Sequence, residues 1–205
     1  MAKSKSSKNW LQEHFNDPWV KKAQQEGYRS RAAFKLIEIA QKDKLFRPGM
    51  TIVDLGAAPG GWLQVLEKEL KGQGKIIGLD ILPIEPMPGI KIILGDFTEE
   101  EPLYELEKCL QGKQVDLVIS DMAPNISGIA GSDQAKTMYL VELAVDFADN
   151  HLKKGGFFLA KVFQGEGFEV MMKTLKQKYA SVVVRKPQAS RPRSREVYLL
   201  AKGKR

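Results

Sequence analysis

Residues 51–62 read Thr-Ile-Val-Asp-Leu-Gly-Ala-Ala-Pro-Gly-Gly-Trp, an apolar strand that runs into a glycine-rich turn and then into a helix. Small residues let a ligand approach the backbone of such a turn, and the helix N-terminus offers free N–H groups to a carboxylate or phosphate. Pro59 suits the first helical turn, where no amide hydrogen is needed. We therefore expect a ligand at Gly56 and Gly60, although the spacing matches neither G-x-G-x-x-G nor a Walker loop.

On either side of this turn the pattern alternates between strand and helix. Short apolar strands are expected at 51–55, 75–80, 90–94, 115–120 and 156–162. Helices are expected between and after them, at about 60–70, 99–111, 134–152 and 166–178. Such alternation predicts an α/β fold in which helices cover both faces of a mainly parallel sheet.

The two final strands, at 182–184 and 197–200, depart from this alternation. The Pro- and Arg-rich connection between them leaves no room for a helix, and a parallel crossover needs about a dozen residues or more. We therefore expect these strands to form an antiparallel hairpin. A seven-stranded Rossmann-like sheet, mostly parallel with an antiparallel last strand, is typical of methyltransferases, whereas a plain dinucleotide-binding fold would not predict the hairpin.

Length and composition indicate one soluble globular domain. The chain has 205 residues, 43% apolar and 28% charged, and it contains neither a long apolar run nor a secretory signal, so we expect a cytoplasmic monomer outside any membrane. Residues 1–9 are polar and are expected to form a mobile basic tail, while 10–205 form the domain. The domain is expected to begin with helices at 10–25, interrupted near Pro18, and at 30–42, capped by Ser30.

Charge and cysteine content limit the partners. The net charge is +7, which attracts polyanions, although many basic proteins bind no nucleic acid. The N-terminal helices and a C-terminal segment are rich in basic residues, and there we expect RNA to contact Arg29, Arg31, Arg191, Arg193 and Arg195. The segment Glu99–Glu101 is acidic, so the positive charge is not spread evenly along the chain. A lone cysteine, Cys109, excludes an internal disulfide. The sequence has no cluster of His, Cys and carboxylate residues that would indicate a metal site.

Acidic residues lie at the carboxyl ends of the first three strands, where open α/β sheets bind ligands. Asp54 precedes the glycine turn, and Asp80 ends the next strand. In nucleotide-binding folds of this kind, a carboxylate at the position of Asp80 accepts hydrogen bonds from ribose hydroxyls. Asp96 can accept from an adenine amino group, with Phe97 beside the ring. Each acid alone could equally serve a turn or a cap. The set indicates an adenosine with an amino-acid tail rather than NAD, because nothing suits a pyrophosphate or a hydride transfer.

The strand at 115–120 runs into Asp121-Met-Ala-Pro-Asn125. In outline this segment resembles the Asn/Asp-Pro-Pro-aromatic loop of amino methyltransferases, in which the aromatic ring stacks on a flipped base. Asn125 stands at the aromatic position, which disfavours an exocyclic amine as the target. A pyrimidine C5 target would need a cysteine nucleophile, and Cys109 lies in a predicted helix away from this loop.

Three further charged residues have both a functional and a purely structural interpretation. Lys161 lies at the end of an apolar strand. It is either a candidate general base or one half of a structural ion pair. Burial or a neighbouring ammonium lowers the pKa of a lysine and frees its lone pair. Lys35 could supply that ammonium, or form a solvated pair with Glu38. Glu196 opens the last strand and could be an exposed strand-end charge.

Taken together, the motifs resemble those of the FtsJ/RlmE family, the bacterial 23S ribosomal RNA uridine 2′-O-ribose methyltransferases. The resemblance covers nearly the whole chain. It rests on residues 10–15, Tyr28–Ala32, Asp54–Trp62, Ser120–Asn125, Lys161–Gly167 and Ser194–Tyr198.

The resemblance implies S-adenosylmethionine as the cofactor and a uridine of 23S RNA in the large (50S) subunit as the substrate. It places a catalytic tetrad on Lys35, Asp121, Lys161 and Glu196, with Lys161 as the general base. It also implies the cofactor contacts Gly60, Trp62, Asp80, Asp96 and Asp121.

Three alternatives stay open at this point. One is an RNA-binding assembly factor of the same fold that has lost catalysis, although the complete tetrad argues against it. Another is an NAD-dependent oxidoreductase. The third is the same chemistry on transfer RNA or on a messenger RNA cap.

Overall fold

The computed structural model describes residues 16–125 and 127–205. Its core is a seven-stranded sheet in the order β3-β2-β1-β4-β5-β7-β6. In chain order the strands are β1 Met50–Leu55, β2 Gly74–Asp80, β3 Ile90–Leu94, β4 Val115–Ser120, β5 Leu152–Phe163, β6 Tyr179–Arg185 and β7 Glu196–Lys204.

The pairing confirms the predicted mixed sheet. β3, β2, β1, β4 and β5 are mutually parallel, and β7 runs antiparallel to both of its neighbours, β5 and β6. β7 therefore inserts between β5 and β6, which places Tyr198 opposite Lys161 in the sheet register. This register places residues from the end of the chain next to β5, one strand in from the edge of the sheet.

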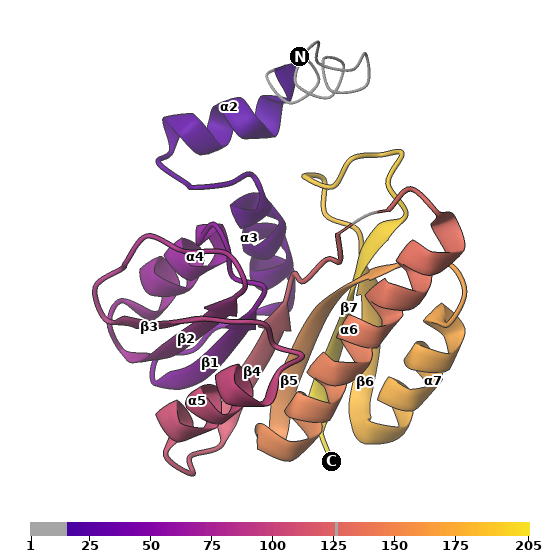
Figure 1. The fold of residues 1–205 in the computed structure, drawn as a ribbon. Coiled ribbons are helices and arrows are strands. Elements are labelled where there is room, and N and C mark those ends of the chain that lie inside the picture. The colour runs from indigo at the N-terminus through magenta and orange to yellow at the C-terminus, as the bar shows by residue number, and fades with distance from the viewer. Residues whose placement is uncertain (1–15, 126) are drawn as a thin grey trace.

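Helices cover both faces of the sheet (Figure 1). α5 Glu100–Leu110, α6 Ala130–His151 and α7 Phe168–Lys178 pack on one face, around buried side chains that include Leu106, Phe147 and Leu175. α3 Ala32–Asp43 and α4 Gly61–Leu70 pack on the other face, where Leu36 and Leu63 are fully buried. The central parallel strands β1 and β4 are buried from both sides, as their largely apolar sequence predicts, whereas the edge strand β3 is partly exposed.

The N-terminal helices differ in detail from the expectation. A helix, α2 Pro18–Gln25, begins at Pro18, because Asp17 caps it by accepting a hydrogen bond from the Trp19 amide at 2.9 Å. Ser30 is not the cap of α3: its backbone carbonyl, not its hydroxyl, accepts from the helix. The predicted tail at 1–9 and the predicted helical residues 10–15 lie outside the described residues.

Pro59 also lies elsewhere than predicted. α4 begins at Gly61 with Gly60 as its N-cap, so Pro59 precedes the helix instead of standing in its first turn. The turn retains its predicted position directly after β1.

An ion cluster and a lysine cap tie the C-terminal strands to the helices. Asp43, at the end of α3, accepts two hydrogen bonds from the Arg185 guanidinium and one from Lys202 Nζ. Burial alone would raise the pKa of Asp43, but the hydrogen bonds and charges of its two partners outweigh it and lower the pKa. Lys204 donates to the carbonyl of Leu152 and to two carbonyls at the end of α6, a common way to satisfy a helix C-terminus.

Within 16–125 and 127–205, no helix is long and apolar enough to cross a membrane. The same residues contain no group of three or more His, Cys, Asp or Glu side chains that could hold a metal ion.

Candidate active site

A cavity of about 520 Å³ opens at the carboxyl ends of the central parallel strands. Its wall is formed by the segments that follow β1, β2, β3 and β4 and by one face of α6. The residues are Gly56, Ala58, Leu79, Asp80, Ile81, Leu82, Gly95, Asp96, Phe97, Thr98, Asp121, Met122, Ala123, Pro124, Asn125, Lys136, Tyr139 and Leu140. The volume suits a nucleoside-sized ligand, and the position is the one that the strand-end acids predict.

Two of the predicted acids line this cavity, and backbone amides fix their carboxylates. Asp80 accepts from the Ala58 amide at 2.8 Å and from the Leu82 amide at 2.9 Å, one on each oxygen. Asp96 accepts from the amide and the hydroxyl of Thr98, both at 2.8 Å on one oxygen. A carboxylate oxygen has more than one lone pair, so both acids retain acceptor capacity toward a ligand's hydroxyl or amino groups.

The glycine turn brings two loops into close approach. Gly56 has a positive φ of 80°, and a Cβ there would lie 2.7 Å from the Met122 amide nitrogen. Only glycine fits this position, because the backbone conformation is left-handed and the loop after β4 leaves no space. The turn, Asp80 and Asp96 together form a cradle whose donors and acceptors suit the hydroxyl and amino groups of a nucleoside.

Of the other predicted cofactor residues, Phe97 lines the cavity, whereas Trp62 and Gly60 do not. Phe97 lines it and packs its ring edge against Phe147. The Trp62 side chain is 3% exposed, donates to the Ala32 carbonyl and packs on Tyr198, outside the cavity lining. Gly60 caps α4 behind the wall. Gly60 lies beside Arg29 and Ile84, whereas Trp62 contacts the start of α3.

Asp54 is buried completely beneath the turn. Its two carboxylate oxygens have no hydrogen-bond partner among the described residues. Burial, then the charges of Asp121 and Asp80, raise the pKa of Asp54 well above its usual value. A carboxyl in this environment favours the neutral, protonated form.

Lys161 and Asp121 meet at one end of the cavity. Lys161, from β5, is 8% exposed, and its Nζ donates to the Asp121 backbone carbonyl at 2.6 Å. The same Nζ lies 3.2 Å from Asp121 Oδ1. Asp121 lies directly after β4 and is itself part of the cavity wall. The strand-end lysine is therefore paired with an acid, and that acid belongs to the ligand site.

Lys35 pairs with Glu196 rather than with Glu38. Lys35 Nζ donates to Glu196 Oε1 at 2.7 Å, and the lysine is 8% exposed. The Ser190 hydroxyl donates to the same oxygen at 2.8 Å. Glu38 instead accepts from the Gln188 amide. Burial excludes both the solvated helix pair and the exposed strand-end charge that the sequence left open.

Tyr198 joins the two lysine pairs, and the sequence analysis did not single it out. Its hydroxyl donates to Asp121 Oδ1 at 2.9 Å, and Lys35 Nζ lies 5.7 Å from the centre of its ring. Burial, then the charges of Asp121 and Glu196, raise the pKa of the Tyr198 hydroxyl well above its usual value. The hydroxyl thus stays a donor.

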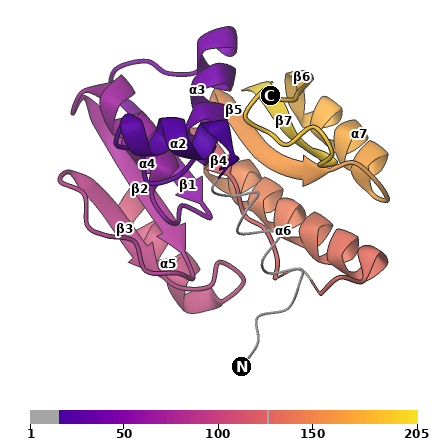
Figure 2. The same ribbon diagram turned by 90° about the horizontal axis from the view of Figure 1, so that it is seen from above.

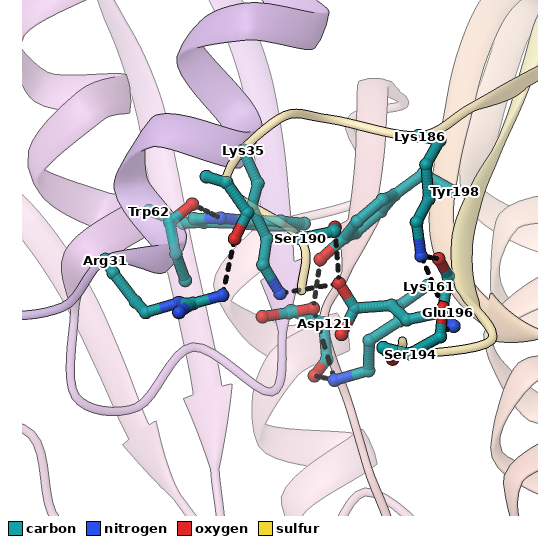
Figure 3. Close-up of polar contacts among 12 residues, drawn as sticks. Arg31, Lys35, Trp62, Asp121, Lys161, Lys186, Ser190, Ser194, Glu196 and Tyr198 are labelled. Carbon is teal, nitrogen blue, oxygen red and sulfur yellow. Dashed lines mark hydrogen bonds and ion pairs between the residues drawn. The ribbon is translucent and has the colours of Figure 1, made fainter. Parts of the chain in front are cut away.

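The signal that could have found Tyr198 is the period of a strand, because residues two apart share a face. Figure 3 shows the resulting network between α3, the loop after β4, β5 and β7. It contains all four residues of the predicted tetrad together with Tyr198 and Ser190.

The predicted RNA-binding arginines divide into two groups. Arg29 and Arg31 contact other parts of the protein: Arg29 donates to the Glu85 carbonyl at 2.8 Å, and Arg31 pairs with Asp17 and donates to the Ala189 carbonyl at 2.5 Å. Arg191, Arg193 and Arg195 lie on the loop 186–195 before β7, where Arg193 and Arg195 are exposed and Arg191 is half-buried. Seen from above, α2 lies over α4 and the strands next to it (Figure 2).

Sequence comparison identifies relatives over almost the whole chain. A family model described as FtsJ-like methyltransferase matches residues 28–204. A protein of Methylobacillus flagellatus is 60% identical over 200 residues, which cover 98% of this chain and 97% of that protein. A protein of Alkalilimnicola ehrlichii is 58% identical over 197 residues, 96% of this chain and 94% of that protein. Both carry the name Ribosomal RNA large subunit methyltransferase E.

A solved structure is similar to this chain as well. A crystal structure of a protein from Plasmodium falciparum, named as a ribosomal RNA methyltransferase, superposes with a TM-score of 0.79 at 30% sequence identity. The superposition covers 86% of this chain and 98% of that one.

Proposed function

The chain belongs to the FtsJ-like methyltransferase family, and from that premise we propose that it methylates the 2′-hydroxyl of a uridine ribose in 23S ribosomal RNA. The donor is S-adenosylmethionine, and the substrate is the large ribosomal subunit. Relatives named Ribosomal RNA large subunit methyltransferase E, 55% to 60% identical over 96% or more of this chain, support the RNA and the subunit. Ribosomal RNA as substrate implies that the protein works in the cytoplasm, and we propose a single methyltransferase domain acting as a monomer.

The observation that carries the chemistry is the pairing of a buried lysine with an acid of the cavity wall. A neutral amine has two N–H groups and one lone pair. The carbonyl and the carboxylate of Asp121, 2.6 and 3.2 Å from Lys161 Nζ, can take both N–H groups. The lone pair is then left to accept the proton of a hydroxyl, which is the role of a general base.

The other members of the network orient these two groups. Tyr198 donates to the Asp121 carboxylate and so fixes the acid that holds Lys161. Lys35, held by Glu196, adds a positive charge beside the entry for RNA, where it would attract the ribose oxygens or the adjacent phosphate. A base held within hydrogen-bond reach of one hydroxyl contributes mainly through alignment.

The cradle of Gly56, Asp80, Asp96 and Phe97 fits the donor. When bound, S-adenosylmethionine supplies a methyl group on a positively charged sulfur, and S-adenosylhomocysteine remains after the methyl has passed to oxygen. Asp80 would bind the ribose hydroxyls, Asp96 the adenine amino group, and Phe97 would flank the ring. Gly60 and Trp62 would hold the turn in shape, and Asp121 connects the cofactor to the base.

For RNA we propose the surface formed by α2, the start of α3 and the loop 186–195. Lys186 donates to the carbonyls of Ser194 and Glu196, both at 2.6 Å, and thereby shapes the loop that presents Arg193 and Arg195. Phosphate attraction of this kind weakens steeply with salt. An affinity for large subunits that does not change between low and high salt would contradict the surface.

The test is to incubate the protein with methyl-labelled S-adenosylmethionine and large subunits that lack the modification, and then to digest the RNA to nucleosides. We expect label in 2′-O-methyluridine. Label on a base would contradict the ribose target. Absence of label despite measurable cofactor binding would favour a different RNA or the non-catalytic assembly factor.

A further inference from the structure

We propose that Arg29 is a positioning residue of the cofactor site, which it stabilises by holding the loop after β1 against the loop after β2. This inference rests on the proposed function, since it concerns the binding of the same cofactor. It assigns Arg29 a role different from the RNA contact that the sequence predicts.

The contacts of the Arg29 guanidinium lie on two cavity-forming loops. Its Nη1 donates to the Glu85 carbonyl at 2.8 Å and, at a longer 3.4 Å, to the Pro59 carbonyl. Pro59 directly follows Ala58, and Glu85 lies three residues after Leu82; both Ala58 and Leu82 line the cavity. A single side chain therefore joins two segments that are otherwise 26 residues apart in the chain.

A second link between the same loops lies inside the cavity. Asp80 Oδ2 accepts from the Ala58 amide at 2.8 Å. The two loops are thus connected on the ligand side by the proposed ribose-binding carboxylate and on the outer side by Arg29. A loop that carries a ligand-binding group binds better when it is fixed before the ligand arrives, so loss of the outer link should loosen the inner one.

Packing around Gly60 shows that the turn is built to accept the arginine. A Cβ on Gly60 would lie 2.7 Å from Arg29 Nη1 and 3.2 Å from an Ile84 methyl group. The guanidinium and Ile84 therefore fill the space that a side chain at Gly60 would occupy. Arg29 is therefore packed into the turn itself. A residue that only contacted phosphate would not need such packing.

The backbone of Arg29 is fixed as well. Its amide donates to Gln64 Oε1 at 2.7 Å, and Gln64 Nε2 donates to the Gly27 carbonyl at 2.9 Å. Gln64 lies on α4, the helix that begins at the turn. The linker between α2 and α3 is thus attached to the turn through both the backbone and the side chain of one residue.

The experiment measures the equilibrium Kd for S-adenosylhomocysteine and S-adenosylmethionine by calorimetry on the full-length protein and three variants. Arg29→Met keeps an apolar stem against Gly60 and removes the donors. Arg29→Lys keeps a donor and the charge. Lys21→Met removes an exposed charge from α2, in the same basic region, and is the matched control. The unfolding temperature without cofactor reports whether each variant is folded.

We expect Arg29→Met to raise the cofactor Kd about 3- to 10-fold, the effect of losing one or two modest hydrogen bonds, with partial rescue by Arg29→Lys. We expect Lys21→Met to leave the Kd unchanged and to weaken only binding of large subunits. A wild-type Kd in Arg29→Met, with subunit binding weakened as in Lys21→Met, would overturn the inference in favour of a phosphate contact. Failure of the wild type to bind either cofactor would instead contradict the proposed function.

Discussion

The cofactor cradle and the lysine network share one residue, Asp121, and are built in opposite ways. In the cradle, Asp80 and Asp96 bind backbone groups two residues further along the chain. In the lysine network, Lys161 and Asp121 are 40 residues apart, and Lys35 and Glu196 are 161 apart. Most hydrogen bonds to the acids of the first region are local turn contacts, and the Ala58–Asp80 bond is the long-range exception. The second region depends on the order of the strands.

The difference extends to charge. The acids of the cradle are held by neutral amides and hydroxyls, so their negative charge remains available to a ligand. The acids of the lysine network are each paired with the side chain of a buried lysine. The cradle is thus arranged to bind a ligand, and the lysine network is arranged to hold a proton acceptor in place. The two should therefore respond separately to mutation.

The largest effect is expected from Lys161→Met, which keeps the bulk of the side chain and removes the amine. The rate of methyl transfer to large subunits at saturating cofactor should fall by about 10²- to 10⁴-fold, the usual contribution of a general base. Single-turnover kinetics measures it. The cofactor Kd, measured on the same sample, should change less than about threefold, because the ribose- and adenine-binding groups are untouched. A variant that keeps a near-normal rate would show that Lys161 is not the base.

The next largest effect is expected from Asp80→Asn, which should weaken cofactor binding and leave the rate of methyl transfer at saturation nearly unchanged. Hydrogen bonds to a charged acceptor contribute roughly 1.5–3 kcal/mol, so the cofactor Kd should rise by about 10- to 100-fold. With cofactor raised to saturation, the single-turnover rate should return to within a few-fold of the wild type. A rate that stays low at saturation would mean that the two regions are not separable.

A smaller effect is expected from Lys35→Met. Glu196 would keep the Ser190 hydroxyl but lose its ammonium partner, and misplacement of the network should lower the single-turnover rate by about tenfold. Glu196→Gln is the matched control, because it keeps the shape and the Ser190 contact while it weakens the ion pair. If both variants transfer methyl at the wild-type rate, this pair serves the fold alone.

The Asp43 cluster belongs to neither region and should affect stability without affecting either activity. Asp43→Asn should lower the free energy of unfolding by about 1–3 kcal/mol, since Arg185 and Lys202 lose a charged partner. The lowered pKa of Asp43 means that its contribution is present above the ordinary value of 3.8 and is lost as the pH falls through the lowered folded value. Urea unfolding from pH 7 to pH 2.5 measures this, and the variant should lose less stability over that range than the wild type.

The same contrast explains what the sequence could predict. All seven strands and the antiparallel hairpin follow from apolar runs and from a connection too short for a helix. The cavity follows from strand-end acids. Some boundaries were less accurate. β5 begins at Leu152 and α6 at Ala130, each four residues before the expected start, and the register of β5 shifts near its start. β7 ends at Lys204, four residues after the expected end. β5 follows α6 directly, and hydrophobic periodicity does not mark the residue at which the helix ends and the strand begins.

The lysine network could be predicted only through the family resemblance. Nothing local to Lys35 indicates a partner 161 residues away, and its helix position alone favours Glu38. Tyr198 was missed although it lies two residues from Glu196 on the same face of β7. The RNA prediction for Arg29 and Arg31 rests on charge. A pattern of charges reveals neither the backbone carbonyls to which both arginines donate nor the pairing of Arg31 with Asp17.

The most direct test of the division into two regions is a crystal structure of the protein with S-adenosylhomocysteine bound. The account predicts both ribose hydroxyls within hydrogen-bond distance of the Asp80 carboxylate, the adenine amino group at Asp96, and the sulfur at the Asp121 end, on the side of Lys161. A cofactor bound with its sulfur pointing away from Asp121 and Lys161, or outside the cradle, would contradict it.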